Sequence, residues 1–282
     1  MIKKALLTGT TGGLGTEIAK ILAQDGWNLV LLNRNSEQSK QQIASLNSEF
    51  ASQTFDSFQV NLMDLHDIRQ VSQEIADAHP QIAAIYNVAG LLTDKRIMSA
   101  QEIESHFALN TLAPYMILQA FKPQLKASAS QENPAFIANF SSSAIDSVKT
   151  LNVDQLVNPE KIGGLLDAYA KTKAALNVMA CFLKEELSAD HIYIYAVDPG
   201  PTKTKMTSNN QGMPWFLKPL VPFLFKDPQT QAKTLLEGIQ AAIQKHETGV
   251  FISNGKVKNH PAFAHDPETQ NELRQLMDQL IA

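Results

Sequence analysis

The sequence predicts an α/β fold in which helices cover both faces of a single doubly wound parallel sheet. Short apolar runs alternate with segments of helical spacing along almost the whole chain, a pattern that favours parallel strands joined by right-handed crossovers. The runs are apolar at consecutive positions, as expected of strands buried on both faces. A glycine-rich turn also separates the first apolar run from the first helix. We therefore expect one domain over residues 1–282.

These patterns place six strands and the helices between them. The expected strands are 5–7, 29–32, 58–60, 82–88, 135–140 and 192–197. The expected helices are 17–24, 36–48 with Asn35 as its cap, 68–75, 103–118 and 169–187. One segment, about 203–227, breaks the alternation because it is spaced by prolines and rich in Trp, Phe and Leu. We interpret this segment as an insertion within the domain.

Composition narrows the class of protein. The chain has 24 Lys and Arg against 28 Asp and Glu, a net charge of −4, and no dense basic run, which argues against a nucleic-acid partner. The single cysteine, Cys181, cannot form an internal disulfide. No apolar run approaches the length of a membrane span, and the first apolar run is too short for a signal peptide. These features predict a cytoplasmic enzyme.

The turn after the first strand has the composition of a phosphate-binding loop. It reads Thr8-Gly9-Thr10-Thr11-Gly12-Gly13-Leu14-Gly15, with the important glycines at 9, 13 and 15. Glycines at this point let the backbone turn tightly and approach a pyrophosphate, whose charge is favourable at a helix N-terminus. The alternative is an ordinary glycine-rich turn between a strand and a helix.

Four further motifs follow in a fixed order. They are Asn87-Val88-Ala89-Gly90 at the fourth strand, Asn110 in the next helix, Ser141-Ser142-Ser143 after the fifth strand, and Tyr169-Ala170-Lys171-Thr172-Lys173 in the long helix. Together with the glycine turn, this set resembles the short-chain dehydrogenase/reductase family, whose fold is a Rossmann-type sheet. The resemblance continues through Pro199 and Gly200 to Thr204. The long segment between Ser142 and Tyr169 and the ending at 251–256 are similar to the retinol dehydrogenase-like branch.

The spacing of Tyr169 and Lys173 suits proton transfer. Residues four apart on a helix lie on one face, and a lysine cation beside a tyrosine is expected to lower the tyrosine pKa from about 10 toward neutral pH. The family resemblance implies that Tyr169 is the catalytic acid and that Lys173 also binds the nicotinamide ribose. The alternative for Tyr169 is a tyrosine of the core beside a solvated lysine.

A hydroxyl donor beside the tyrosine would stabilise charge on a carbonyl oxygen. Alternation along the strand separates Ser142 from Ser141 and Ser143, and the resemblance favours Ser142, with Ser143 as the alternative. Tyr169 lies 27 positions after Ser142, so 152–164 is expected to loop out. The resemblance also implies that Asn110 holds a water beside Lys173, although Asn110 could instead bond a neighbouring carbonyl.

The resemblance and the fold together give a set of cofactor-binding positions. They are Gly9, Thr11, Gly13, Leu14, Gly15, Asn33, Arg34, Asn61, Leu62, Asn87, Ala89, Gly90, Tyr169, Lys173, Pro199, Gly200, Thr202 and Thr204. The cofactor is predicted to be NADP, because Asn33 replaces the acidic residue that would repel a 2′-phosphate and Arg34 can bind phosphate oxygens. Asn61 leaves the base pocket neutral, and Thr204 resembles the residue that holds the carboxamide.

The predicted function is NADP-dependent interconversion of a carbonyl and an alcohol on a lipophilic small molecule. Segment 203–227 is expected to cover the substrate, or alternatively to form a membrane or partner surface. Two other functions remain open: an NADP-sensing module without catalysis, and an epimerase or dehydratase. We expect no metal, because His260 and His265 show no ligand pattern and nothing pairs with them. The apolar helix face at Ala174, Val178 and Phe182 could serve the core or a homodimer or homotetramer contact.

Overall fold

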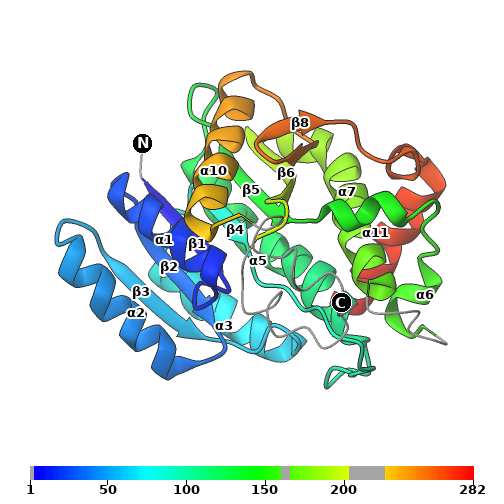
Figure 1. Cartoon of the computed structure of the whole chain (residues 1–282), viewed down its shortest axis with the longest axis horizontal. Helices are drawn as coiled ribbons and strands as arrows, with labels where there is room; N and C mark the ends of the chain where they lie inside the picture. Colours follow the sequence, from blue (N-terminus) through cyan, green and yellow to red (C-terminus); the bar gives the residue numbers. More distant parts are fainter. Residues whose placement is uncertain (1–2, 160–165, 203–225) are drawn as a thin grey trace.

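The computed structural model describes residues 3–159, 166–202 and 226–282. Its sheet has the strand order β3-β2-β1-β4-β5-β6-β7-β8 (Figure 1). The strands are β1 (Lys4–Thr8), β2 (Asn28–Asn33), β3 (Phe55–Gln59), β4 (Ala84–Asn87), β5 (Ala135–Phe140), β6 (Ile192–Asp198), β7 (Val250–Ser253) and β8 (Lys256–Lys258). All neighbours pair in parallel except β7 and β8. The predicted doubly wound parallel sheet is therefore confirmed, with one antiparallel strand at its edge.

Helices cover both faces of this sheet. One layer contains α1 (Gly13–Gln24), α2 (Ser36–Glu49) and α10 (Pro228–Gln244), and the other contains α3 (Leu65–Ala78), α5 (Ala113–Ser128), α7 (Asp167–Ser188) and α11 (Pro267–Ile281). Between α3 and α5 lie the short α4 (Ser105–Phe107) and a π-helical turn (Ala108–Leu112), and α6 (Asp154–Val157) precedes α7. Neighbouring strand residues such as Leu6 and Leu7 are both fully buried but belong to different apolar cores. This is why the strands are apolar at consecutive positions.

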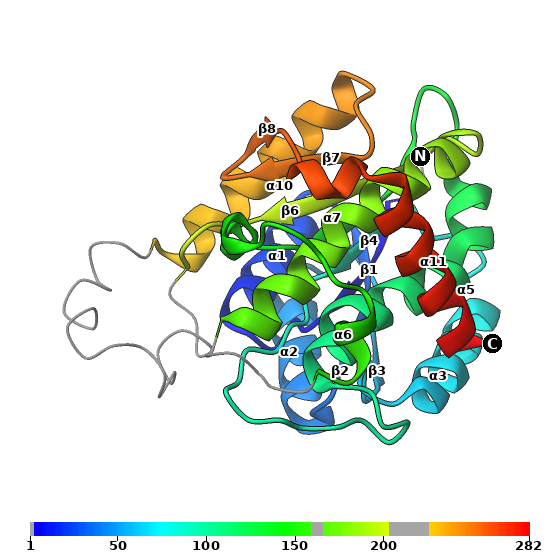
Figure 2. The same ribbon diagram turned by 90° about the vertical axis from the view of Figure 1, so that its right-hand side faces the viewer.

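The C-terminal helix α11 packs beside α7 (Figure 2). Leu273 and Met277 of α11 are fully buried in the core shared with α7, and the guanidinium of Arg274 lies 5.7 Å from the centre of the Phe182 ring. Ala174 and Val178 are fully buried in the same core. The apolar face of α7 that the sequence left unassigned is therefore covered by this chain's own core and tail.

Several predicted boundaries are wrong by a few residues. The third strand was expected at 58–60 but is β3, Phe55–Gln59, because pairing with β2 extends along a largely polar edge strand. The helix expected from residue 103 begins at Ser105, where the Glu104 carboxylate caps it by accepting from two backbone N–H groups. The helix expected from residue 17 begins at Gly13. The Asn35 cap is confirmed, since its side chain accepts from the Gln38 N–H.

Candidate active site

The glycine turn brings β1, α1 and β4 into close contact. Gly9 has φ +69°, and a Cβ there would lie 2.8 Å from the Ala89 Cα. A Cβ at Gly15 would lie 2.4 Å from the Gly9 carbonyl oxygen, so both positions require glycine. Helix α1 begins after Gly12 with no side chain capping it and no acidic residue in its first turn. Its first N–H groups, from half-buried Gly13 onward, are therefore available to an anion.

Two other predicted residues of this turn differ in exposure. Thr11 is half-buried beside the start of α1, whereas Leu14 is buried in the core. Only the backbone of Leu14 can therefore take part in a binding site.

The side chain of Asn33 supports the glycine turn. Its Oδ1 accepts from the Thr10 N–H at 2.9 Å, and its Nδ2 donates to the Thr10 Oγ1 at 2.8 Å. Gln42 of α2 also holds Thr10, by donating to its carbonyl oxygen at 2.9 Å. Because Asn33 is only 3 % exposed and its amide is used by Thr10, it shapes the loop instead of presenting its side chain to a ligand. Sequence analysis missed both Thr10 and Gln42.

Arg34 follows Asn33 at the carboxyl end of β2, and its side chain is exposed. Within residues 3–159, 166–202 and 226–282 its guanidinium forms no ion pair with an acidic side chain. Asn61, after β3, is exposed, and its N–H donates to the Asp67 carboxylate at 2.6 Å. Its neighbour Leu62 is buried. Among the described residues, the exposed and unpaired Arg34 therefore places a cation at this edge, beside the glycine turn.

Asn87 and Asn139 join β4 to β5. The Asn87 Nδ2 donates to the Asn139 Oδ1 at 2.8 Å, and both side chains are buried. The prediction gave Asn87 a place against the cofactor, but its amide faces the neighbouring strand. The loop after β4 continues with Ala89, whose N–H donates to the Thr8 hydroxyl at 3.1 Å. Ala89 is half-buried and directly precedes Gly90.

Gly90, Asn110 and Lys173 converge at the start of that loop. Asn110 lies in the π-helical turn, and its amide both accepts from the Leu91 N–H at 2.8 Å and donates to the Leu91 carbonyl oxygen at 3.0 Å. A Cβ at Gly90 would lie 3.4 Å from both the Asn110 Oδ1 and the Lys173 Nζ. The alternative role of Asn110, a bond to a neighbouring carbonyl, is therefore present, and its position near Lys173 leaves the water-holding role a prediction.

Tyr169 and Ser142 meet where β5 ends against α7. The Ser142 hydroxyl lies close enough to the Tyr169 hydroxyl to lower the pKa of that tyrosine, and the Ser142 Oγ accepts from the Ala144 N–H at 3.2 Å. Ser143 is exposed. The Lys173 Nζ lies 5.8 Å from the centre of the Tyr169 ring and donates to the Phe140 carbonyl oxygen. This geometry favours Ser142 over Ser143 as the hydroxyl that acts with Tyr169.

The electrostatics of this cluster differ from the sequence prediction. Burial raises the pKa of Tyr169, the nearby Ser142 hydroxyl lowers it by less, and the Asp198 carboxylate raises it again. Burial lowers the pKa of Lys173 to about 7. The expected lowering of the tyrosine pKa is therefore wrong for this structure. The Lys173 ammonium lies over the ring and bonds Phe140, so its charge does not outweigh desolvation of the phenolate.

The end of β6 contributes a buried carboxylate that sequence analysis missed. Asp198 accepts from the Gly200 N–H at 2.9 Å and from the Ser253 hydroxyl at 3.0 Å. Gly200 has φ +76°, and the Thr202 hydroxyl donates to its carbonyl oxygen at 2.9 Å. An acidic residue directly before Pro199 at a strand end was the available signal. Thr204 and 203–225 of the expected substrate cover lie outside the described residues.

Comparison with known proteins agrees with this geometry. The family model described as short chain dehydrogenase matches residues 3–153. The chain belongs to this family. Human polyprenol dehydrogenase is 27 % identical over 275 residues, which cover 95 % of this chain and 82 % of that protein. Human retinol dehydrogenase 11 is 26 % identical over 256 residues, covering 89 % and 78 %.

Solved structures share the fold of this short-chain dehydrogenase. The Pseudomonas aeruginosa RhlG/NADP active-site complex superposes with a TM-score of 0.70 at 24 % identity, covering 93 % of this chain and 96 % of that chain. The predicted family is confirmed, as is its resemblance to retinol dehydrogenases.

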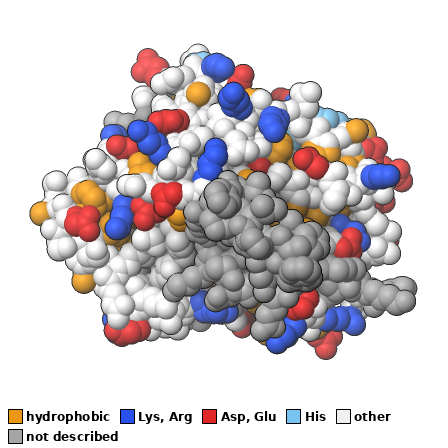
Figure 3. All heavy atoms as spheres, in the orientation of Figure 1, with side chains coloured by type: hydrophobic (Ala, Val, Ile, Leu, Met, Phe, Trp, Pro, Cys, Tyr) orange, Lys and Arg blue, Asp and Glu red, His pale blue; other side chains and the backbone are white. Residues whose placement is uncertain are grey.

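The short-chain dehydrogenase site has the features that a dinucleotide requires. The uncapped α1 N-terminus suits a pyrophosphate, and glycine at position 90 leaves room beside Asn110 and Lys173. Acidic and basic side chains are interspersed over the face seen in Figure 3. The described groups that could recognise a phosphate are local ones, the backbone of the turn and Arg34.

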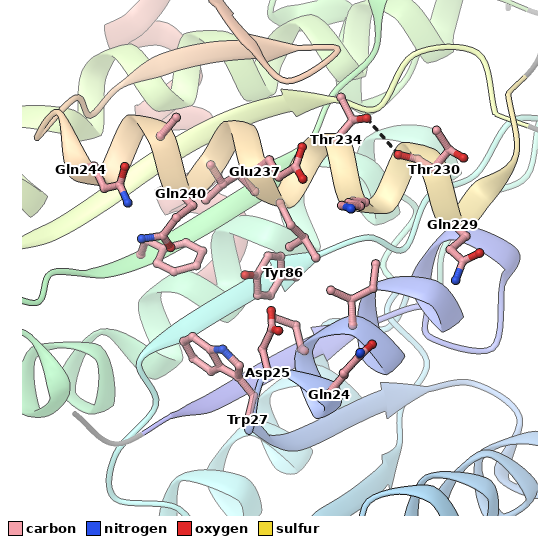
Figure 4. Close-up of a pocket in the computed structure, with 17 residues that line it drawn as sticks. Gln24, Asp25, Trp27, Tyr86, Gln229, Thr230, Thr234, Glu237, Gln240 and Gln244 are labelled. Carbon is pink, nitrogen blue, oxygen red and sulfur yellow. Dashed lines mark hydrogen bonds between the residues drawn. The ribbon is translucent and has the colours of Figure 1, made fainter.

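A pocket of about 900 Å³ lies away from these residues, between α1 and α10 (Figure 4). Tyr86 and Phe136 line its inner side, with ring centres 5.5 Å apart, and Asp25 and Trp27 lie near the C-terminal end of α1. None of the predicted site residues lines this pocket. The glycine turn is at the opposite end of α1, so the pocket is separate from the candidate active site.

The described part of the short-chain dehydrogenase contains neither a metal-binding cluster nor a membrane-spanning helix. No group of three or more His, Cys, Asp or Glu side chains there could hold a metal ion. None of the helices in the described ranges combines the length and hydropathy needed to cross a bilayer.

Proposed function

We propose that this short-chain dehydrogenase uses NADP to interconvert a carbonyl and an alcohol on a lipophilic small molecule. The observation that carries the proposal is the convergence of Ser142 and Lys173 on Tyr169: Ser142 is near enough to lower the tyrosine pKa, and the Lys173 Nζ lies 5.8 Å from the centre of the tyrosine ring. Three groups that can donate a proton or a hydrogen bond thereby meet at the carboxyl end of β5. An NADP-sensing module would need the glycine turn but not this cluster.

The residues of the cluster have distinct proposed roles. When bound, the reduced nicotinamide supplies a hydride to the carbonyl carbon. The Tyr169 hydroxyl donates its proton to the carbonyl oxygen, and its raised pKa keeps it protonated for this step. Ser142 donates a hydrogen bond to the same oxygen as negative charge develops. Lys173, buried beside Asn110 and Gly90, binds the ribose and returns a proton to Tyr169.

The glycine turn and Arg34 account for the proposed cofactor. The backbone N–H groups at the start of α1 bind the pyrophosphate. The exposed Arg34 guanidinium binds the 2′-phosphate, and no carboxylate at position 33 opposes it. Solved neighbours described as NADP complexes support this choice. Asn33 contributes by holding Thr10, and thus the shape of the loop.

The lipophilic substrate rests on similarity. The names of two relatives refer to polyprenol and retinol, and segment 203–227 is rich in apolar side chains. The test is NADPH oxidation by the purified protein with aldehydes and ketones graded by chain length. We expect kcat/KM to rise with apolar chain length. Higher activity on small polar ketones would reject the lipophilic substrate, and NADPH binding without turnover of any carbonyl would favour the sensing module.

A further inference from the structure

His260 in the C-terminal tail is hydrogen-bonded at both ring nitrogens. Its Nε2 lies 2.8 Å from the Gly249 carbonyl oxygen, and its Nδ1 lies 3.2 Å from the Asn177 Nδ2. A carbonyl oxygen can only accept, so Nε2 must carry the proton. Nδ1 is then an acceptor, and the Asn177 amide must donate to it. The fold thus brings His260 against α7 and gives it two hydrogen-bond partners that the sequence did not indicate.

The orientation of the Asn177 amide determines how it bonds Ser141 at the end of β5. Asn177 is fully buried and lies one helical turn after Lys173. With its Nδ2 directed at His260, its Oδ1 accepts from the Ser141 hydroxyl at 2.8 Å. The same hydroxyl lies 3.0 Å from the Lys173 carbonyl oxygen, and the Ser141 N–H donates to the Val197 carbonyl oxygen at 2.7 Å. Ser141 thus connects β5 and β6 to the turn of α7 that contains Lys173.

We propose that His260 is a positioning residue for the proposed carbonyl–alcohol reaction. Through its Nδ1 acceptor it orients Asn177, and Asn177 with Ser141 holds the end of β5 against α7. Ser142 is the next residue along the chain and Tyr169 lies one turn before Lys173, so this chain of bonds sets where the two hydroxyls meet. The inference rests on the proposed function of that pair.

The surroundings of His260 keep its Nδ1 free to accept. Its ring packs against the Phe251 ring and lies 5.7 Å from the His265 ring, centre to centre. Burial lowers the pKa of His260 to about 4, and His265 and Lys184 add to this effect against the Gly249 carbonyl, which raises it. A protonated Nδ1 would oppose the Asn177 Nδ2 as a second donor. Asn177 would then have to turn its amide, and Ser141 could donate only to Lys173.

Two substitutions of His260 test its two hydrogen bonds separately, because each can keep one bond and lose the other. In His260→Asn the shorter amide can place its oxygen where Nδ1 lies and accept from Asn177. In His260→Gln the longer amide can place its nitrogen where Nε2 lies and donate to Gly249. We expect His260→Gln to lower kcat about tenfold and His260→Asn to stay within about twofold of wild type, since small displacements of reacting groups are costly. KM and the NADPH dissociation constant should change less than about twofold in both.

A double-mutant cycle tests the route of the coupling. If the effect of His260 reaches the site through Asn177 and Ser141, the double variant Ser141→Ala/His260→Gln should lose no more kcat than the worse single variant. The matched control is His265→Asn, because His265 is exposed and touches the same region, and its kcat at neutral pH should be unchanged. Equal losses in His260→Asn and His260→Gln, or no loss in either, would show that the histidine merely anchors the tail.

A spectroscopic measurement that does not depend on turnover tests the direction of the two His260 hydrogen bonds. Imidazole 1H–15N correlation spectra should show His260 as the Nε2–H tautomer, neutral between pH 5 and 9, in wild type. In Asn177→Leu protein the Nδ1 resonance should shift to that of an acceptor without a hydrogen bond, while Nε2 keeps its proton and its bond to the Gly249 carbonyl. A proton on Nδ1 overturns the inference whatever the enzyme does. Failure of Tyr169→Phe to lower kcat rejects the proposed function instead. If Tyr169→Phe lowers kcat but His260→Asn and His260→Gln have equal kcat values, only the role of His260 is rejected.

Discussion

The two halves of the carboxyl edge of the sheet are built in different ways. At the ends of β1 and β2, the groups offered to a ligand are backbone N–H groups and the exposed Arg34. At the ends of β4, β5 and β6, they are buried side chains, with Lys173 and Asp198 each only 3 % exposed. The first half presents groups that already face water, whereas the second keeps its ionisable groups out of water.

This difference explains which features of the edge could be predicted from local sequence. A glycine turn at a helix N-terminus acts through local backbone geometry, which a short motif specifies. The pKa of Tyr169 depends on everything packed around it, and burial reverses the direction expected from Lys173 alone. Within the first half, Asn33 is the exception, because its role was set by a long-range bond to Thr10.

The largest expected effect is on the half of the edge at the ends of β4, β5 and β6, which contains the proposed catalytic residues. Tyr169→Phe should lower kcat at least ~10²-fold, because it removes the proposed proton donor. The NADPH dissociation constant should change little, because the turn and Arg34 are untouched. Steady-state kinetics and fluorescence of bound NADPH measure the two quantities separately. Near-full activity would mean that another group supplies the proton, and lost binding would mean that the two halves are not independent.

The second prediction concerns the pH dependence of stability. The pKa of Lys173 is about 7 in the folded chain, below its ordinary value of 10.5. Between these values the unfolded chain binds more protons, so folding is favoured as pH rises through this window and is opposed most below pH 7. Lys173→Met should therefore stabilise the fold at pH 6, and this gain should shrink by about 3 kcal/mol between pH 6 and pH 9. Urea unfolding at both values measures this, and a gain independent of pH would contradict the buried charge.

The third prediction concerns the other half of the edge, at the ends of β1 and β2, where the proposed cofactor contacts lie. Wild-type protein should bind NADPH at least tenfold more tightly than NADH, about 1.4 kcal/mol, because the exposed Arg34 can bind the 2′-phosphate. Arg34→Ala should remove most of this preference and leave NADH affinity and the free energy of unfolding nearly unchanged. Titration of both cofactors into both proteins is the measurement. Equal wild-type affinities would reject the role of Arg34.

The smallest expected effect separates Asn33 from Arg34. Asn33→Ala removes the bonds to Thr10 and should lower the free energy of unfolding by about 1 kcal/mol. The retained bond from Gln42 to Thr10 limits the loss. The affinities for NADPH and NADH should fall together, because the loop shape serves both. A selective gain in NADH affinity would show that Asn33 contacts the ribose directly.

Periodicity and motif order were sufficient for the fold class and most of the strands, since alternation of apolar runs and helices is a local property of the chain. The region after β6 was left without expected elements, and there the structure adds α10, β7, β8 and α11. Strands β7 and β8 are four and three residues long, too short for periodicity to identify. Their pairing with β6 and with each other is what makes them strands.

By itself, the sequence determined the glycine turn, the pairing of Tyr169 with Lys173 on one helix face, and the candidate serines, because these depend on neighbours a few residues apart. The tertiary structure decided that Asn33 bonds Thr10, that Ser142 and not exposed Ser143 meets Tyr169, and that His260 reaches Asn177. Hydrogen bonds across 23 and 83 residues leave no spacing signal. Burial, which sets the pKa values of Tyr169 and Lys173, exists only once the sheet and both helix layers have packed.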